Sequence, residues 1–312
     1  MSQYRQNLPQ MKDGIYLADG GLETTLVFHD GLDLPCFAAF PLLDTTKGRD
    51  TLRAYFARYM KIAAQNGLGF ILDTATWRAN TDWGAKVGYD QTALDRVNRD
   101  AVTFIADLRA NLANAGKPVV LSGVIGPRGD GYVAGAAMSE REAETYHARQ
   151  AIAFADSECD MVSAVTMTNI PEAIGIARAA KAVKMPVVIS FTVETDGNLP
   201  SGDSLENAIT ATDTATGGYP AYYMINCAHP THFQQRLGKG GWIERIGGVR
   251  ANASAKSHAE LDAATELDPG NPQELAAQYR ELRRLLPRAN VLGGCCGTDH
   301  RHIEHIAHAC AA

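Results

Sequence analysis

Eight short apolar segments recur along the 312-residue chain, and each is followed by a turn and a stretch with helical periodicity. Several of them, such as PVVLSGVIG and PVVISFTV, are nearly continuous apolar runs, as in strands buried on both faces of a parallel sheet. Eight strands alternating with helices predict an α/β protein with a (β/α)8 TIM barrel fold, and an open doubly wound sheet is the alternative. The predicted strands span residues 15–21, 70–76, 119–125, 161–168, 187–193, 222–227, 246–253 and 290–294.

Amphipathic patterns predict helices over residues 51–66, 93–115, 139–157 and 272–286. Ser139 and Glu142 form the capping box that opens the third of these helices. Residues 255–270 are irregular and acidic, and we expect a long loop there. No Pro/Gly/Ser-rich linker divides the chain, so we predict one domain over residues 1–312.

The composition excludes several classes of partner. The formal net charge is -6 and the basic residues are scattered, which argues against nucleic-acid binding. No run of 18 apolar residues predicts a membrane span, and the polar N-terminal stretch lacks the apolar core of a signal peptide. We therefore expect a cytoplasmic protein with reduced cysteines that acts on small molecules. The sequence does not predict its oligomeric state.

Three of the six cysteines stand where two predicted strands end. Cys227 ends the sixth strand, and Cys295 and Cys296 lie in the sequence GGCCG at the end of the eighth. Neighbouring residues of a strand point to opposite faces, but the flanking glycines allow a turn that directs both sulfurs inward. Because the carboxyl ends of parallel barrel strands converge, we predict that the three thiolates bind Zn²⁺ and leave its fourth position open.

Other interpretations of these residues stay open. Cys227 could be a small buried side chain, and Cys295 with Cys296 could be a redox pair. His302, His305 and His308 share a helical face, for which a polar surface is favoured over a second metal site. Outside the predicted zinc site, we assign His229 and His232 to its surroundings and the other three cysteines, Cys36, Cys159 and Cys310, to packing or surface.

Motifs along nearly the whole chain resemble those of the homocysteine S-methyltransferases, which are zinc enzymes with a (β/α)8 barrel. They are LADGGLETTL, SGVIGPRGDGY, MSEREAETYHARQ, PVVISFTVETDGNLPSG, INCAHP and GGCCGTDHRHI. The resemblance implies that Cys227, Cys295 and Cys296 bind zinc. It also implies that the turn Asp19-Gly20-Gly21 holds the amino-acid part of a thiol substrate, with Asn226 and Trp77 among the substrate contacts.

This chemistry implies a methyl transfer to sulfur. Zinc deprotonates a bound thiol, and three protein thiolates already give the site a formal charge of about -1, so the substrate sulfur remains nucleophilic. The donor should carry its methyl group on a sulfonium or ammonium centre, such as S-methylmethionine or S-adenosylmethionine, and homocysteine would yield methionine. Trp77 could face this cation through its ring.

Two positions depart from the family pattern. Met167 stands where a Glu that grips the homocysteine ammonium is expected, and Arg250-Ala251-Asn252 keeps only the Asn of a Pro-Asn pair. Glu194 could compensate from the next strand. We therefore keep a different small thiol as an alternative acceptor, and a zinc hydrolase or a non-catalytic thiol-binding barrel as alternative functions.

Overall fold

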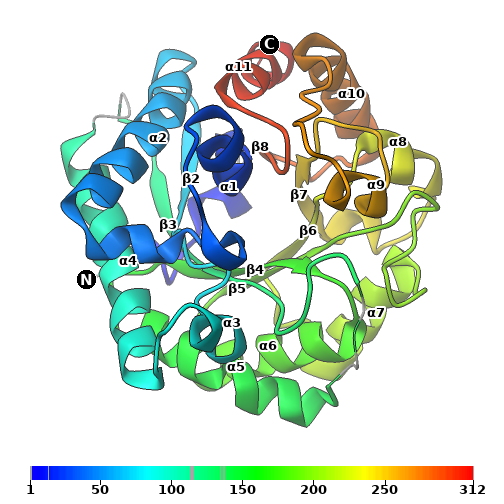
Figure 1. Ribbon diagram of the computed structural model, residues 1–312. Coiled ribbons are helices and arrows are strands. Elements are labelled where there is room, and N and C mark those ends of the chain that lie inside the picture. The colour runs from blue at the N-terminus through cyan, green and yellow to red at the C-terminus, as the bar shows by residue number, and fades with distance from the viewer. Residues whose placement is uncertain (1, 13, 113–115, 134, 136–137, 312) are drawn as a thin grey trace.

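The computed structural model describes residues 2–12, 14–112, 116–133, 135 and 138–311, and it forms a closed barrel of eight parallel strands (Figure 1). The strands follow one another around the barrel in chain order, and β8 closes it by pairing with β1. The predicted (β/α)8 fold is therefore confirmed. The strands are β1 (Tyr16–Leu17), β2 (Gly69–Asp73), β3 (Val119–Ile125), β4 (Met161–Met167), β5 (Val187–Phe191), β6 (Tyr222–Asn226), β7 (Ile246–Ala251) and β8 (Val291–Gly294).

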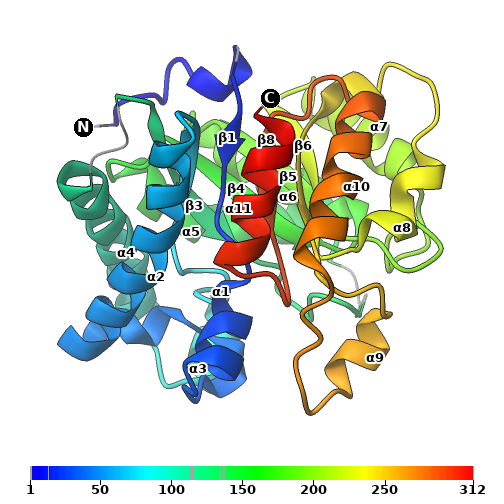
Figure 2. The same ribbon diagram turned by 90° about the horizontal axis from the view of Figure 1, so that it is seen from above.

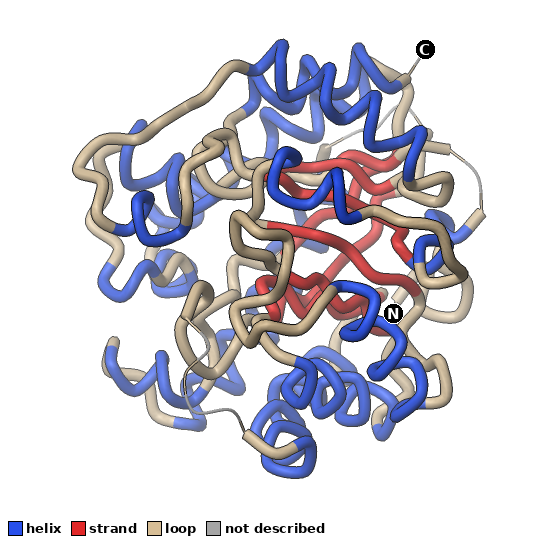
Figure 3. Tube along the Cα trace, turned by 90° about the vertical axis from the view of Figure 1, so that its right-hand side faces the viewer, coloured by secondary structure: helices blue, strands red, loops and turns tan. Residues whose placement is uncertain are grey.

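Helices surround the strands on the outside of the barrel (Figure 3). None of those in the described ranges is long and apolar enough to cross a membrane. The α-helices are α1 (Leu22–Thr24), α2 (Thr46–Gln65), α3 (Thr81–Lys86), α4 (Gln91–Asn111), α5 (Glu140–Ala155), α6 (Ile170–Ala182), α7 (Leu205–Thr216), α8 (Pro230–Phe233), α9 (His258–Asp262), α10 (Pro272–Leu285) and α11 (His300–Cys310).

Most differences from the sequence prediction lie at element ends. The first strand is shorter than predicted because the chain leaves the sheet after Leu17 and turns through residues 18–21 into α1. The capping box of Ser139 and Glu142 opens α5 as predicted. The loop predicted over residues 255–270 is wrong in part, because a second capping box, of Ser257 and Glu260, opens the short helix α9 within it. The end of the predicted helix 93–115, residues 113–115, lies outside the described residues.

Side chains fill the barrel interior at its amino end. These side chains come from the strands and include Tyr16, Ile71, Val120, Met161, Val188, Tyr222, Met224 and Val291. The N-terminal segment closes that end: Gln10 contacts Tyr222, and the buried carboxylate of Asp160 accepts the backbone N–H groups of Gln3 and Tyr4, each at 2.7 Å. At the opposite end of the barrel lie α1, α3 and α9 (Figure 2), and a pocket opens there among the strand ends.

The close packing of α5 against α6 can be tested at Gly175. An added Cβ would contact the Cβ of Ala143 and lie 2.6 Å from the backbone nitrogen of Glu144. Gly175→Ala is therefore expected to lower the free energy of unfolding by about 1–3 kcal/mol in urea titrations. The control Ala54→Gly, at an exposed position of α2, should lower it by about 1 kcal/mol because alanine is normally the better helix former. Stabilisation by Gly175→Ala would show that α5 and α6 lie further apart.

Candidate metal centre

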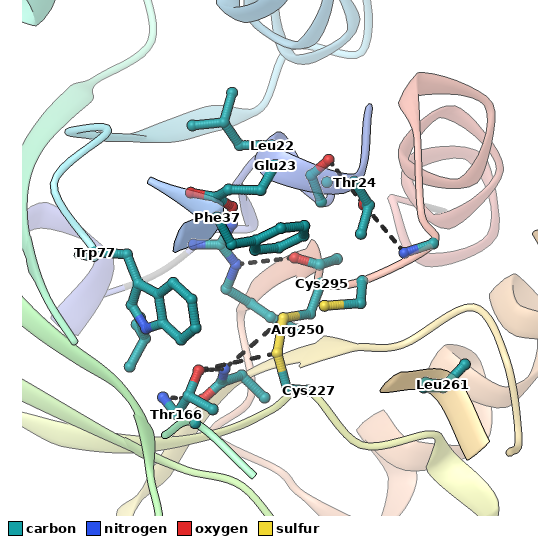
Figure 4. Close-up of a pocket in the computed structure, with 18 of the residues that line it drawn as sticks. Leu22, Glu23, Thr24, Phe37, Trp77, Thr166, Cys227, Arg250, Leu261 and Cys295 are labelled. Carbon is teal, nitrogen blue, oxygen red and sulfur yellow. Dashed lines mark hydrogen bonds between the residues drawn. A yellow bond between two sulfur atoms is a disulfide. The ribbon is translucent and has the colours of Figure 1, made fainter. Parts of the chain in front are cut away.

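A pocket of about 440 Å³ opens at the carboxyl end of the barrel, and we call it the central pocket. Cys227, directly after β6, and Cys295 and Cys296, directly after β8, all line it (Figure 4). Their sulfur atoms lie within 4.8 Å of one another. Four ligands around a tetrahedral zinc ion with Zn–S bonds of about 2.3 Å place sulfurs about 3.8 Å apart. The three sulfurs thus lie close enough together to share one zinc ion once Cys227 and Cys295, which are joined by a disulfide in this structure, are reduced and move apart.

The two neighbouring cysteines face the same pocket because β8 ends before them. The alternation of a strand stops at Gly294, and the next residues form a turn in which the Thr298 N–H donates to the Cys295 carbonyl at 3.1 Å. Gly297 occupies the left-handed region of this turn, with φ of 78°. The glycine-dependent turn expected from GGCCG is therefore present.

Cys227 and Cys295 are joined by a disulfide in this structure, contrary to the expectation of reduced cysteines, and Cys296 keeps a free thiol. Burial raises the pKa of the Cys296 thiol to about 11, and the Tyr132 hydroxyl lies 3.0 Å from its sulfur. Reduction of the disulfide by two electrons and two protons would give three thiols. All three thiols must then lose their protons to bind one metal ion as thiolates. Soft thiolates are the ligands that zinc prefers.

Cys227 has an unusual backbone conformation, with φ of 52°. Its N–H donates to the Arg250 carbonyl at 3.1 Å, and its own carbonyl accepts from Asn252 at 3.0 Å and from the His258 ring at 2.6 Å. Such strain persists only where the surroundings impose it, and it is common at functional sites. His258 did not emerge from the sequence because it lies in the segment predicted as a loop, although the capping box at Ser257 was a signal for a helix there.

Asn226 lines the central pocket, but its amide is already engaged. Its carbonyl oxygen accepts the Thr166 N–H at 2.9 Å and the Ser190 hydroxyl at 2.6 Å, and its NH₂ group donates to the Thr166 hydroxyl at 2.9 Å. The same NH₂ group lies 3.9 Å from the Cys295 sulfur. Asn226 thus fixes Thr166 and the sulfur side of the pocket, while direct substrate binding by it stays a prediction.

Met167 does not line the central pocket; it is fully buried in the core between the barrel and its helices. The reason is a bulge in β4 between Ala164 and Met167, where Thr166 has φ of 63°. The extra residue turns Val165 and Thr166 toward the pocket and sends Met167 outward. The resemblance to the family placed Met167 where a pocket-facing Glu is expected, but Met167 is not a pocket residue, and the pocket-facing pair at the end of β4 is Val165-Thr166.

Neither the bulged strand nor β5 supplies the carboxylate expected there. Val165 is apolar, and Glu194 is not among the pocket residues. Its carboxylate lies 3.0 Å from the other nitrogen of the His258 ring instead. The compensation considered for Glu194 is thus absent, because this side chain supports His258 and through it the Cys227 carbonyl.

Asp19 and the two glycines after it line the central pocket, but most of their polar groups are occupied. One Asp19 oxygen pairs with Arg250, and the other accepts the Tyr55 hydroxyl at 3.1 Å. The Gly21 N–H donates to the Thr298 carbonyl at 3.0 Å. Burial raises the pKa of Asp19 and the Arg250 charge opposes this rise. The turn therefore has its own internal partners, and its role in holding a substrate stays a prediction.

Glycine is required at both positions of this turn by close contacts. A Cβ on Gly20 would lie 2.8 Å from the Thr298 carbonyl oxygen, and one on Gly21 would lie 2.6 Å from that of Cys295. The turn therefore packs directly against the loop that carries the two neighbouring cysteines.

The sequence profile of the homocysteine S-methyltransferases matches residues 16–310. This chain belongs to the homocysteine S-methyltransferase family. It is accordingly an S-methyltransferase. Among solved structures, it is similar to the homocysteine methyltransferase MmuM from Escherichia coli. The metallated form is 22% identical with a TM-score of 0.75, covering 98% of this chain and 99% of that one.

The oxidised form of MmuM is 20% identical with a TM-score of 0.75, covering 97% of this chain and 99% of the other. Its apo form is 20% identical with a TM-score of 0.69, covering 98% and 100%. These structures share the barrel fold of the family. A comparison with curated proteins finds no match.

One face of the Trp77 ring is already covered by an arginine side chain. Trp77 lines the central pocket, and the Arg78 guanidinium lies 3.9 Å from its ring centre. Arg78 also lies 3.7 Å from the ring centre of Trp83 and donates to the Gly129 carbonyl. Trp77 therefore already makes one cation–π contact, and its contact with a methyl donor stays a prediction.

The histidines of α11 do not form a metal site. Within the described residues, the cysteines 227, 295 and 296 are the only group of three or more His, Cys, Asp or Glu side chains placed to hold an ion. His302 is fully buried and contacts Asp299 and the Pro269 carbonyl, whereas His308 is exposed. The prediction of a shared polar face is thus wrong for His302, which ties α11 to the loop before α10.

Glu23 is a pocket residue that the sequence reasoning missed. It lies on α1, two residues after the Asp19-Gly20-Gly21 turn, and lines the central pocket beside Phe37 (Figure 4). Burial raises the pKa of its carboxyl to about 7, and the charges of Arg78 and Arg250 oppose this rise. Its place in the first turn of a helix that follows a strand-end glycine pair was the available signal.

Arg250 can be tested through the two carboxylates that it neutralises. Arg250→Met should lower the free energy of unfolding by about 3–5 kcal/mol in urea, because Asp19 and Asp73 would remain buried without a counter-ion. The triple variant Asp19→Asn/Asp73→Asn/Arg250→Met removes the uncompensated charge and should recover most of the loss. A single variant as stable as the native protein would contradict a buried ion-pair network.

Glu23 should destabilise the ligand-free protein at high pH. Its pKa is raised in the folded state, so stability falls as pH rises from the unfolded value near ~4.5 through about 7. Glu23→Gln should therefore raise the melting temperature above pH 7 and leave it unchanged below about pH 4.5. A pH series of thermal melts at constant metal content measures this, and an equal difference at all pH values would exclude a titrating Glu23.

Proposed function

We propose that this protein transfers a methyl group from a positively charged donor to the sulfur of a small thiol, and that Cys227, Cys295 and Cys296 hold the Zn²⁺ ion on which the transfer depends. The observation that carries the proposal is the convergence of three cysteine sulfurs, within 4.8 Å of one another, on one pocket. When bound, zinc would lower the pKa of the acceptor thiol and keep its sulfur as a nucleophilic thiolate.

The protein itself supplies the orientation of the reacting groups. Asn226 and Thr166 hold the sulfur side of the pocket, and the Tyr132 hydroxyl lies against Cys296 from the opposite loop. The Tyr132 ring stacks on His258, with ring centres 4.1 Å apart, and so couples the loop after β3 to the segment after β7. Holding the two reactants in a fixed relative position supplies much of the rate acceleration of an in-line methyl transfer.

The charge of the pocket favours a cationic donor. Seven carboxylates line it against two guanidinium groups, those of Arg78 and Arg250. Such an excess of negative charge attracts a positively charged ligand and repels an anionic one. A sulfonium such as S-methylmethionine or S-adenosylmethionine fits this pocket, and its product after loss of the methyl group is neutral at sulfur.

Homocysteine is the acceptor that family membership favours, with methionine as the product. Val165 at the end of β4 and the pairing of Asp19 with Arg250 favour a second candidate, a small thiol without an amino group. A zinc hydrolase is disfavoured because three thiolates donate so much charge that a zinc-bound water would remain poorly acidic.

The proposal predicts that zinc content and methyl transfer are lost together. Reduced protein should bind one zinc ion per chain and methylate homocysteine. Cys227→Ser, Cys295→Ser and Cys296→Ser should each lose at least tenfold in zinc affinity and nearly all turnover, because each removes one of three ligands. Metal analysis by mass spectrometry and product analysis with each donor measure both quantities.

Cys36→Ser is the matched control, since Cys36 is an exposed cysteine outside the site and should leave both quantities unchanged. Methyl transfer by metal-free protein would overturn the role of zinc. Zinc binding without methyl transfer to any thiol would favour the non-catalytic barrel, and release of product without a thiol would favour a hydrolase.

A further inference from the structure

An amino thiol bound in the central pocket would bring a buried ammonium group with it. Moving such a charge out of water is costly unless a carboxylate faces it. The end of β4 offers none, because Val165 and Thr166 face the pocket there. The partner of an ammonium group must therefore come from another element.

Asp19 is already committed to other groups. One of its oxygens pairs with Arg250 and the other accepts the Tyr55 hydroxyl, while Arg250 also pairs with Asp73. The side chains of Asp19, Asp73 and Arg250 are only 5%, 7% and 12% exposed. An ammonium group that took Asp19 from Arg250 would have to break a buried ion pair, which costs several kcal/mol.

The carboxylates at the outer part of the pocket are also poor partners. Asp130 accepts the backbone N–H groups of Tyr132 and Val133, and Asp268 accepts from Ser254 and Gly270. The two other outer carboxylates, Asp262 and Glu266, are exposed to solvent, where an ion pair contributes little.

Glu23 differs from all of these. It forms no salt bridge with any residue in the described part of the chain, although it is half-buried and lines the same pocket as the three cysteines. In the view of Figure 4 it lies on the other side of the sulfur atoms from Thr166 and the end of β4. Its charge also acts on Cys296, and burial raises the pKa of the Glu23 carboxyl to about 7. A desolvated carboxylate without a paired cation is what an ammonium group would complete.

We infer that Glu23, on α1, binds the ammonium group of the acceptor thiol and thereby selects amino thiols such as homocysteine. The inference rests on the proposed function, since it assumes that the acceptor sulfur lies at the three cysteines. It moves amino-group recognition from the end of β4 to the helix that follows β1. Arg250 retains Asp19 as part of the framework beneath the pocket.

The test compares two acceptors that differ only in the amino group, homocysteine and 4-mercaptobutanoate. Glu23→Gln should raise the KM for homocysteine at least tenfold and change that for 4-mercaptobutanoate less than twofold, because only homocysteine has the ammonium that the carboxylate contacts. Glu23→Asp, which keeps the charge, should recover part of the homocysteine affinity. The KM for the methyl donor should not change.

Glu304→Gln, at an exposed position of α11, is the control and should alter neither acceptor. Equal losses for both acceptors would overturn the inference and indicate a structural role for Glu23. So would an unchanged KM for homocysteine, or a rise in the KM of the donor alone.

Calorimetric binding of homocysteine to zinc-loaded protein without donor gives the same comparison independently of turnover. A higher Kd for homocysteine in Glu23→Gln than in the native protein, at equal zinc content, supports the inference even if no methyl transfer is found. An equal Kd in both proteins overturns it. Native protein that transfers methyl groups while Glu23→Gln behaves identically would overturn only the role of Glu23 and leave the proposed function intact.

Discussion

The guanidinium group of Arg250 joins four strands of the barrel at the end where the pocket lies. From β7 it pairs with Asp19 after β1 and with Asp73 at the end of β2, and it donates to the Gly294 carbonyl of β8 at 3.2 Å. A buried charge must be paired to be tolerated, so these contacts fix one another's positions. The loop with the two neighbouring cysteines begins at Gly294, and the glycine turn after Asp19 packs against it. The geometry of the sulfur site therefore depends on this ion pair.

A second constraint comes from two strained residues on the other side of the pocket. Thr166 and Cys227 both have positive φ, at 63° and 52°, and neither is glycine. Asn226 lies between them and bonds both the N–H and the hydroxyl of Thr166, while Asn252 and His258 hold the Cys227 carbonyl. Conformations of this kind cost about 1–3 kcal/mol each and persist where the surroundings over-determine them. Here they direct Thr166 and the Cys227 sulfur into one pocket.

These two constraints affect the chemistry differently. The positions of the sulfur atoms depend on the ends of β6 and β8 and on the tight turns that follow them. Binding of the polar end of the acceptor depends on single side chains. Here Asp19 forms an ion pair with Arg250, and Val165 carries no charge. A carboxylate on α1 can replace one on β4 because both elements border the same pocket. Recognition of the acceptor can thus change while the three cysteines keep their places.

The sequence by itself determined the barrel and the three cysteines. Eight apolar segments alternating with helices leave few other folds, and strand-end cysteines beside glycines can be recognised because strand ends converge in a parallel barrel. The sequence also showed that a carboxylate was missing from the end of β4. It could not show which residue stands there, because the bulge between Ala164 and Met167 shifts the alternation by one position. Only the tertiary structure decided that Val165 faces the pocket, that Asp19 is neutralised by Arg250, and that Glu23 forms no salt bridge within the described part of the chain. The pairing of Asp19 with Arg250 joins residues more than 200 positions apart, and no local sequence pattern encodes such a contact.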